Sequence, residues 1–186
     1  MENIEKELQR ADAFCVGSGL GKDKKVLGIV KKIISKTKKP CAIDADALGV
    51  VDKKNLKGKP FVLTPHRKEF EIFGKLIENI EQNKKAVEKA AKNLGVVILL
   101  KGPTDIISDG TNTKLNKTGN PYMTKGGTGD VLTGIVGSLL AQGLKPFRAA
   151  CLGAYISGLA GDAVSKEKGP GLLATDVIEK IPEIIK

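Results

Sequence analysis

The stretch Gly126-Gly127-Thr128-Gly129-Asp130 carries the strongest chemical signal in the sequence. It stands immediately before residues 131–142, whose apolar residues predict a buried helix. Glycines let the backbone turn tightly and approach a ligand closely, and the first amides of a helix are unpaired donors at the positive end of the helix dipole. We therefore expect an anion to bind at this turn.

Asp130 is the residue of this turn that could take part in a reaction. Phosphoryl transfer needs donors aimed at the transferring oxygens and a carboxylate that takes a proton from the attacking hydroxyl. At the start of the helix, Asp130 is placed to be that base. The alternative is a plain capping residue, because glycine-rich helix starts are common and Asp often caps them. The turn alone leaves both interpretations open.

Other residues with chemical potential follow short apolar runs that read as strands. In an open parallel sheet, ligands bind at the carboxyl ends of the strands. We therefore expect these residues to face one crevice. They are Gly19 in the turn Gly17-Ser18-Gly19-Leu20-Gly21, Asp44 and Asp46, His66 after Thr64-Pro65, and Lys101 before Gly102-Pro103.

The elements that must position these residues alternate between short apolar runs and helix-length segments, which is the pattern of βαβ units. The fold class predicted is α/β, with a mostly parallel sheet flanked by helices on both faces, and no linker or repeat divides residues 1–186. Strands are predicted at 13–16, 41–43, 61–63 and 96–100, helices at 26–36, 78–94, 131–142 and 146–166, and a small hairpin at 105–108 and 113–115.

Composition limits the class of protein. Hydrophobic residues make up 41% of the chain and aromatic residues only 4%, so the core must rest on Val, Ile, Leu and Ala, as in buried parallel strands. The net charge of +10 raises the question of nucleic-acid binding. Lysines are spread among acidic residues and few aromatics are available for base stacking. We expect a solvated surface that weakly attracts anionic nucleotides, and no nucleic-acid partner.

Cysteine usage and the chain's hydropathy bear on its compartment. Cys15, Cys41 and Cys151 are odd in number, lie far apart and show no zinc-binding spacing, so buried unpaired thiols are expected. No signal-peptide pattern and no run of ~18 apolar residues occurs. We expect a cytoplasmic protein without a membrane partner.

Several separated motifs together resemble the ribokinase-like superfamily and, within it, the ATP- or ADP-dependent NAD(P)H-hydrate dehydratases. They stand in the order of that family and cover nearly the whole chain. The motifs are Val16-Gly17-Ser18-Gly19-Leu20-Gly21, Ile43-Asp44-Ala45-Asp46-Ala47-Leu48, Leu63-Thr64-Pro65-His66 with Glu69, Leu100-Lys101-Gly102, Thr118-Gly119-Asn120-Pro121 with Met123, Gly126 to Asp130, Leu140-Ala141-Gln142-Gly143, Gly158-Leu159-Ala160-Gly161-Asp162, and Leu173-Ala174-Thr175-Asp176.

The resemblance implies a role for each matching residue. Gly126, Gly127, Thr128 and Gly129 would form the anion hole, with Gly129 near the nucleotide and Asp130 at the reacting hydroxyl of the hydrated nicotinamide. Gly19 and His66 resemble the family's substrate contacts. One further stretch resembles the family's adenine-nucleotide segment, and it consists of Lys101, Gly102, Pro103, Thr104 and Asp105.

The implied reaction uses ATP or ADP with Mg²⁺. Phosphorylation of the hydroxyl of hydrated NADH or NADPH, followed by loss of phosphate, restores the dihydropyridine. No residue is assigned as a metal ligand. The assembly expected is a homo-oligomer.

Alternatives remain for single residues. A lone histidine after a Thr-Pro turn is otherwise more often a structural hydrogen-bonding residue than a ligand contact, and the motif around His66 reverses that preference. Lys101 could instead end a strand with its charge in solvent. We favour a loop role for Asp46, whereas for Asp44 a phosphate- or metal-associated role and a turn role both stay open.

The chain also departs from the family's pattern. It matches the C-terminal two thirds of the family domain, so the first strands are expected to be missing and an apolar sheet edge to be exposed. Ser18 stands where Pro is usual, Asp105 where many members have Thr, and Ser157 where His is common. Two other functions are therefore kept: a related kinase for a vitamin precursor or sugar, and a non-catalytic nucleotide-binding remnant.

Overall fold

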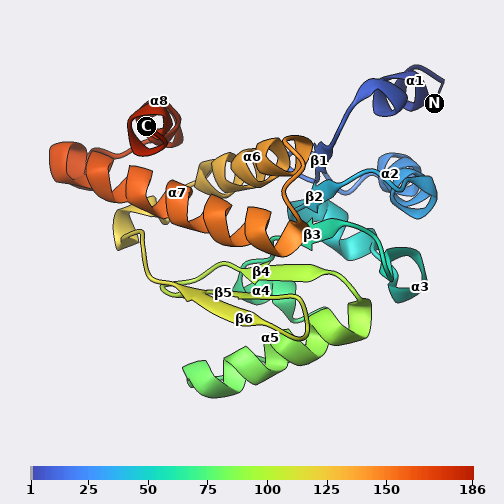
Figure 1. Ribbon diagram of the computed structural model, residues 1–186, viewed down its shortest axis with the longest axis horizontal. Coiled ribbons are helices and arrows are strands. Elements are labelled where there is room, and N and C mark those ends of the chain that lie inside the picture. Colours follow the sequence, from blue (N-terminus) through green and yellow to red (C-terminus); the bar gives the residue numbers. More distant parts are fainter. Residues whose placement is uncertain (1) are drawn as a thin grey trace.

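A six-stranded sheet forms the centre of the molecule, in the order β1-β2-β3-β4-β5-β6. The computed structural model describes residues 2–186. Strands β1 to β4 are parallel, and β5 and β6 add an antiparallel hairpin (Figure 1). The predicted mostly parallel sheet and the hairpin are both confirmed. The bounds are β1 Phe14–Val16, β2 Cys41–Ile43, β3 Phe61–Leu63, β4 Val97–Leu100, β5 Asp105–Ser108 and β6 Thr113–Asn116.

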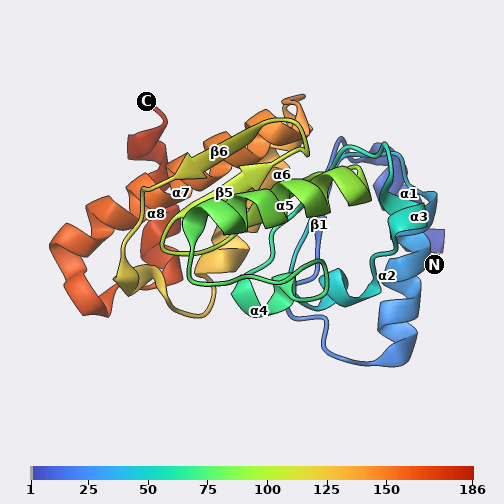
Figure 2. The ribbon, with the colours of Figure 1, turned by 90° about the horizontal axis from the view of Figure 1, so that it is seen from below.

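Helices cover both faces of the sheet, as the α/β class predicts (Figure 2). The first face carries α2 Lys24–Lys36, the 3-10 helix η1 Ala45–Val50, α3 Lys53–Leu56, α4 Arg67–Phe70 and α5 Ile80–Leu94. The second carries α6 Thr128–Ala141 and α7 Pro146–Lys168, against which α8 Ala174–Ile184 packs. The remaining elements are α1 Glu2–Arg10, η2 Pro121–Met123 and η3 Gly169–Gly171.

The alternation of strand side chains explains why two helical layers are needed. Ile43, Leu63 and Ile98 pack into the core beneath α2 and α5, whereas Val62 and Leu99, from the same strands, pack beneath α6 and α7. Successive residues of a strand point to opposite faces, so a strand that is apolar throughout must be covered on both sides. The two helical layers hold the strands in place. The site residues directly follow these strands, so the sheet determines where they lie.

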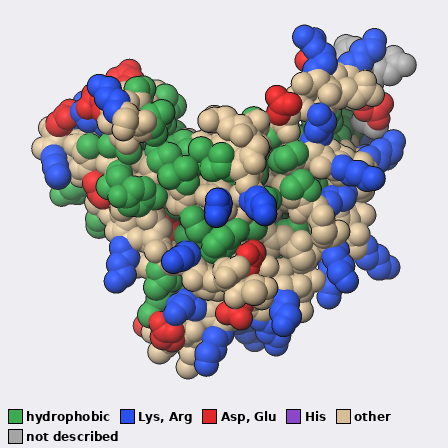
Figure 3. Space-filling view, viewed as in Figure 1, with side chains coloured by type: hydrophobic (Ala, Val, Ile, Leu, Met, Phe, Trp, Pro, Cys, Tyr) green, Lys and Arg blue, Asp and Glu red, His purple; other side chains and the backbone are tan. Residues whose placement is uncertain are grey.

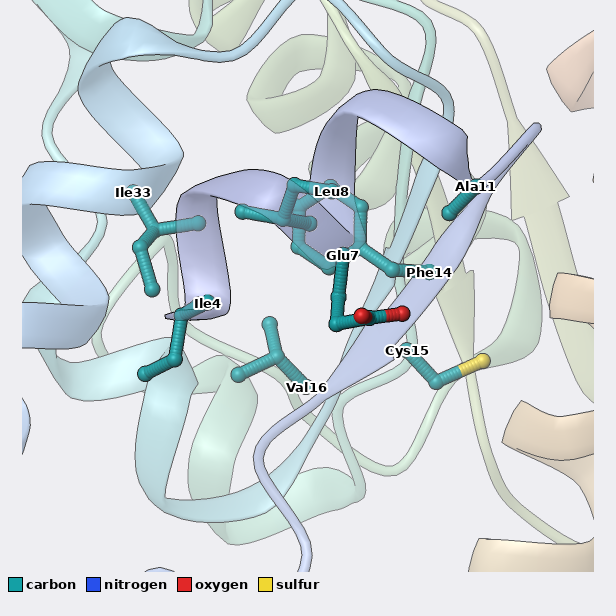
Figure 4. A pocket seen from close by; sticks show the side chains of 8 residues that line it. All are labelled: Ile4, Glu7, Leu8, Ala11, Phe14, Cys15, Val16 and Ile33. Atoms are coloured by element: carbon teal, nitrogen blue, oxygen red, sulfur yellow. The ribbon is translucent and has the colours of Figure 1, made fainter. Parts of the chain in front are cut away.

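Strand β1 forms one edge of the sheet, with an apolar cavity on one of its sides and α6 on the other. Apolar side chains of α1, α2 and β1 line a cavity of about 450 Å³ beside it, among them Ile4, Leu8 and Phe14 (Figure 4). Phe14 and Val16, the large apolar side chains of this edge strand, are partly buried rather than exposed as expected from the sequence. Cys15 points away from Leu8 and Ile33 in Figure 4 and donates to Thr133 O on α6 at 3.3 Å.

The prediction of three buried thiols is correct only for Cys41. Burial raises the pKa of the Cys41 thiol well above its ordinary value, which keeps it protonated. Cys15 is exposed and Cys151 is partly buried. The sequence could not show this, because the short apolar run around Cys15 becomes an edge strand with no neighbour on one side.

Basic side chains are spread over the face of the molecule that Figure 3 shows. In Figure 3 the Lys and Arg side chains lie scattered among acidic and hydrophobic ones. This distribution agrees with a solvated lysine-rich surface. None of the helices in residues 2–186 is both long and apolar enough to cross a membrane.

Candidate active site

The carboxyl ends of the four parallel strands meet at the start of α6. The register β1-β2-β3-β4 brings Gly17, Asp44, His66 and Lys101 to the same edge of the sheet, although they lie far apart in sequence. Lys101 Nζ lies 2.7 Å from Asp44 Oδ1, and a Cβ added to Gly129 would lie 3.3 Å from Lys101 Nζ. The strand ends therefore bring these residues together, as predicted.

The glycine-rich turn forms the N-terminus of α6. Gly127, with φ of 93°, is the N-cap residue and supplies no side-chain cap, and Val131 N is the first amide to find a helical acceptor, Gly127 O at 3.0 Å. Within residues 2–186, the amides of Gly129 and Asp130 donate to no acceptor. These are the unpaired donors that an anion requires. The helix begins at Thr128, three residues before the predicted start, so Asp130 lies inside its first turn.

Asp130 is exposed and does not cap the helix. Its carboxylate makes no hydrogen bond or ion pair with another described residue, whereas the capping position belongs to Gly127. A capping role therefore does not account for Asp130. An unengaged carboxylate beside unpaired amides can accept a proton from a group bound at the turn.

Lys101 is held by a buried carboxylate rather than by solvent. Asp44 is 2% exposed, and its second oxygen accepts a hydrogen bond from Thr133 Oγ1 at 3.0 Å. Thr133 Oγ1 also lies 3.0 Å from Gly129 O and 3.3 Å from Thr64 Oγ1. The alternative of a solvated Lys101 is wrong, because the side chain turns inward to pair with Asp44.

Sequence reasoning missed the two threonines of this network. Thr64 and Thr133 are 0% and 3% exposed. The available signal was Thr133 itself, a polar residue among the apolar residues of the buried side of α6, one turn after Gly129.

His66 has a structural role and an exposed ring. It begins α4 in a capping box: Nδ1 accepts from Glu69 N at 3.1 Å, and Glu69 Oε2 accepts from His66 N at 2.7 Å. The side chain is 53% exposed, so the capping bonds still leave it accessible to a ligand. The structural interpretation and the substrate-contact prediction are therefore compatible.

The glycine loop after β1 is held by Asp46. Asp46 Oδ2 accepts a hydrogen bond from Gly21 N at 2.9 Å, which agrees with the loop role expected for Asp46. Gly19 has a φ of 69° and is exposed, with no atom within 4 Å of an added Cβ. The Gly19 backbone is thus open to a ligand.

Asp105 closes the turn that begins at Lys101. Its Oδ1 accepts from Gly102 N at 3.0 Å and its Oδ2 from Asn116 Nδ2 at 2.9 Å. Desolvation raises the pKa of Asp105, against the opposing effects of Asn116, Gly102 and Lys101. Pro103 and Gly102 remain exposed, so the backbone of this turn is accessible.

The raised pKa of Asp105 predicts a stability component that depends on pH. The folded state binds the proton more tightly than the unfolded state, so this component is present below the ordinary value of 3.8 and is lost as the pH rises through the folded-state value. A carboxyl ¹³C NMR titration should give Asp105 a midpoint above 3.8. Asp109 is the internal comparison: desolvation raises its pKa, but hydrogen bonds from Asn112 and Thr111 outweigh that effect and lower it. An Asp105 midpoint at or below that of Asp109 would contradict the assignment.

The loop that leads into the glycine turn is fixed to α7. Asp162 accepts from Gly119 N at 2.9 Å and from Asn120 Nδ2 at 3.0 Å. A Cβ added to Gly158 would lie 2.1 Å from Thr118 Oγ1, and one added to Gly161 would lie 2.1 Å from a Met123 side-chain atom. The glycines of α7 therefore allow the close approach that sets the path of this loop.

The described part of the chain offers no dedicated metal cage at this site. Among residues 2–186, no group of three or more His, Cys, Asp or Glu side chains is placed to hold a metal ion. A divalent cation at this edge of the sheet would have to take most of its ligands from a bound phosphate and from water.

Comparisons with known proteins agree on one family. A profile described as NAD(P)H-hydrate dehydratase matches residues 1–183. The chain is 40% identical over 196 residues to the bifunctional NAD(P)H-hydrate repair enzyme Nnr of Hyperthermus butylicus, with 100% of this chain and 36% of that protein covered. It is 39% identical to the ADP-dependent (S)-NAD(P)H-hydrate dehydratase of Cenarchaeum symbiosum, covering 94% of this chain and 62% of that protein.

Solved structures show the same similarity. The ADP/ATP-dependent NAD(P)H-hydrate dehydratase of Bacillus subtilis, co-crystallised with ATP/Mg²⁺, aligns with a TM-score of 0.81 at 29% identity over 94% of this chain and 64% of that one. A ribokinase-like superfamily protein of Enterococcus faecalis aligns with a TM-score of 0.81 at 30% identity, covering 98% and 65%. The chain thus spans about a third of the length of the bifunctional relatives and less than two thirds of the single-function one. Because the profile matches residues 1–183, which is nearly the whole chain, the chain belongs to the NAD(P)H-hydrate dehydratase family.

Proposed function

We propose that the chain catalyses the ATP- or ADP-dependent dehydration of hydrated NADH or NADPH back to the reduced cofactor. The observation that carries this proposal is the unengaged carboxylate of Asp130 next to the unpaired amides of the α6 N-terminus. Family membership supports the choice of substrate, because relatives of 39% identity bear the name of this activity.

In this proposal Asp130 is the general base. The terminal phosphate lies at the turn formed by Gly126, Gly127, Thr128 and Gly129, where the unpaired amides of Gly129 and Asp130 stabilise the charge on the transferring oxygens. Asp130 takes the hydroxyl proton as the hydroxyl oxygen attacks phosphorus, and the bond from phosphorus to the departing ADP or AMP breaks. The phosphorylated intermediate then loses phosphate and a ring proton, which restores the dihydropyridine.

The neighbouring loops bind the rest of the two substrates. The exposed backbone of Gly19 and the exposed ring of His66 are assigned to the hydrated nicotinamide. The segment Lys101, Gly102, Pro103, Thr104 and Asp105 is assigned to the adenine nucleotide. The exposure of Gly102 and Pro103 supports this assignment.

Mg²⁺ fits this site as a companion of the nucleotide. Such an ion would take its ligands mainly from the nucleotide's phosphates and from water, which leaves the carboxylate of Asp130 available as the base. The ion would neutralise phosphate charge. The chain's own residues position the turn and accept the proton.

Three wider features belong to the same proposal. Residues 1–186 form a single nucleotide-binding domain that corresponds to the C-terminal two thirds of the family domain. The protein works in the cytoplasm as a homo-oligomer. Coverage of 62% of the single-function relative and 64% of the Bacillus subtilis chain supports the first of these.

The test is the recovery of absorbance in the reduced-nicotinamide band when hydrated NADH is mixed with the protein and either ATP or ADP. We expect recovery that depends on the nucleotide and on Mg²⁺, with release of one phosphate for each NADH formed. A full-length relative assayed in parallel serves as the positive control. A folded sample that binds nucleotide but restores no NADH would contradict the proposal, and accumulation of a phosphorylated alcohol instead would indicate a kinase.

A further inference from the structure

We propose that Asp44 is a positioning residue, which orients the anion-binding turn through Lys101 on one side and Thr133 on the other. This inference rests on the proposed function, since it assigns Asp44 to the same site. It concerns a residue whose role the sequence left open between a turn residue and a phosphate- or metal-associated carboxylate.

Both carboxylate oxygens of Asp44 are already engaged. Oδ1 accepts from Lys101 Nζ at 2.7 Å, and Oδ2 accepts from Thr133 Oγ1 at 3.0 Å. At 2% exposure the carboxylate has almost no contact with solvent. Asp44 is therefore occupied by internal partners rather than directed toward a ligand.

The two partners of Asp44 belong to different parts of the site. Lys101 follows β4 and opens the nucleotide segment, and its backbone N donates to Pro65 O at 2.8 Å, next to His66. Thr133 lies one turn into α6, four residues after Gly129. Asp44 thus links the turn at His66 and the segment at Lys101 to the helix that carries Asp130.

The link reaches the anion-binding turn directly. A Cβ added to Gly129 would lie 3.3 Å from Lys101 Nζ and 3.8 Å from Asp44 Oδ2, so the ion pair packs against the first turn of α6. A paired charge in such a place is fixed more firmly than one in solvent, because moving either partner leaves the other buried and uncompensated. This keeps the amides of Gly129 and Asp130 in one orientation before a phosphate binds.

The hydroxyl of Thr133 connects Asp44 to α6 by a hydrogen bond. It has one proton and two oxygens at 3.0 Å, Asp44 Oδ2 and Gly129 O. A carboxylate is a stronger acceptor than a carbonyl, so the hydroxyl donates mainly to Asp44. Thr64 Oγ1, at 3.3 Å, can donate to Thr133 or to Ile43 O.

The first test replaces Thr133 by Val, which keeps the shape and removes the hydroxyl. We expect kcat to fall about tenfold while KM for hydrated NADH changes less than about twofold, the size expected for one hydrogen bond to a charged group. Thr133→Ser, which keeps the donor, should restore kcat to within about threefold of the wild type on the same scale. Ser138→Ala, which removes an exposed hydroxyl from the same helix, is the matched control and should leave both parameters unchanged.

The second test separates positioning from general stability. In Asp44→Asn the charge of Lys101 is no longer neutralised, and its attraction for phosphate offsets the less fixed orientation of the turn amides, so ATP affinity should stay close to that of the wild type while kcat falls. A merely structural role would weaken binding and turnover together. A drop in ATP affinity that parallels the loss of kcat would overturn the proposal.

Amide NMR keeps this inference distinct from the proposed function. Adding ATP to the wild type should shift the ¹⁵N resonances of Gly129 and Asp130, and Thr133→Val should reduce those shifts whereas Thr133→Ser should not. If the wild type restores no NADH but shows this pattern, the proposed function fails and the role of Asp44 stands. Identical shifts in wild type and Thr133→Val would overturn the role of Asp44 regardless of turnover.

Discussion

Replacement of Asp130 by Asn should lower kcat by about 10²–10⁴, because the amide keeps the shape of the side chain but cannot accept the hydroxyl proton. Nucleotide affinity should change much less. The amides of the α6 turn remain, and one carboxylate that repels phosphate is removed. Single-turnover kinetics for the chemical step and calorimetry for ATP binding measure the two quantities separately.

The control for Asp130→Asn is Asp52→Asn. Asp52 also stands at a helix start, where its side chain accepts from Lys54 N at 3.0 Å, and it lies outside the site. We expect wild-type turnover for this variant. If Asp130→Asn lowers the melting temperature and loses binding and turnover together, Asp130 has a structural role. Turnover within a few-fold of the wild type would mean that another residue is the base.

Replacement of Gly17 by Ala should destabilise the protein by about 3 kcal/mol or more. Gly17 has a φ of 140°, and an added Cβ would lie 1.7 Å from the backbone oxygen of Asp44. That carbonyl cannot move aside freely, because Asp44 N donates to Val16 O at 3.0 Å and Asp44 O accepts from Ala47 N at 3.1 Å. Urea denaturation followed by circular dichroism gives the free energy of unfolding.

Gly28→Ala is the matched control for this second substitution. Gly28 lies exposed inside α2, and no atom lies within 4 Å of an added Cβ. Alanine there should raise the free energy of unfolding by about 0.5–1 kcal/mol, since it has the higher helix propensity. If Gly17→Ala lowers the free energy of unfolding by less than about 1 kcal/mol, the lower limit for a strained backbone position, the close approach of Gly17 to Asp44 does not limit this loop.

The amino-acid pattern determined most of the secondary structure. The apolar runs at residues 41–43 and 61–63 became β2 and β3 with the predicted bounds, because each is short, apolar and bounded by polar or turn residues. The helix predicted at 131–142 begins at Thr128 instead. Glycines usually indicate a loop, and here the left-handed Gly127 starts the helix without a side-chain cap, so the usual start signal is missing.

The sequence also predicted the glycine turn and Asp130 as candidate site residues, because helix-start amides and a nearby carboxylate are local features. It could not decide the role of Asp44 or find Thr133. Asp44 lies 57 residues from Lys101 and 89 from Thr133, and no local rule relates such positions. Only the parallel register of β2, β3 and β4, with α6 packed on one face of the sheet and its N-terminus at the strand ends, brings Lys101 and Thr133 within hydrogen-bonding distance of Asp44. The burial of Asp44 and the exposure of Cys15 were likewise decided by the tertiary structure, since each depends on which elements cover a strand.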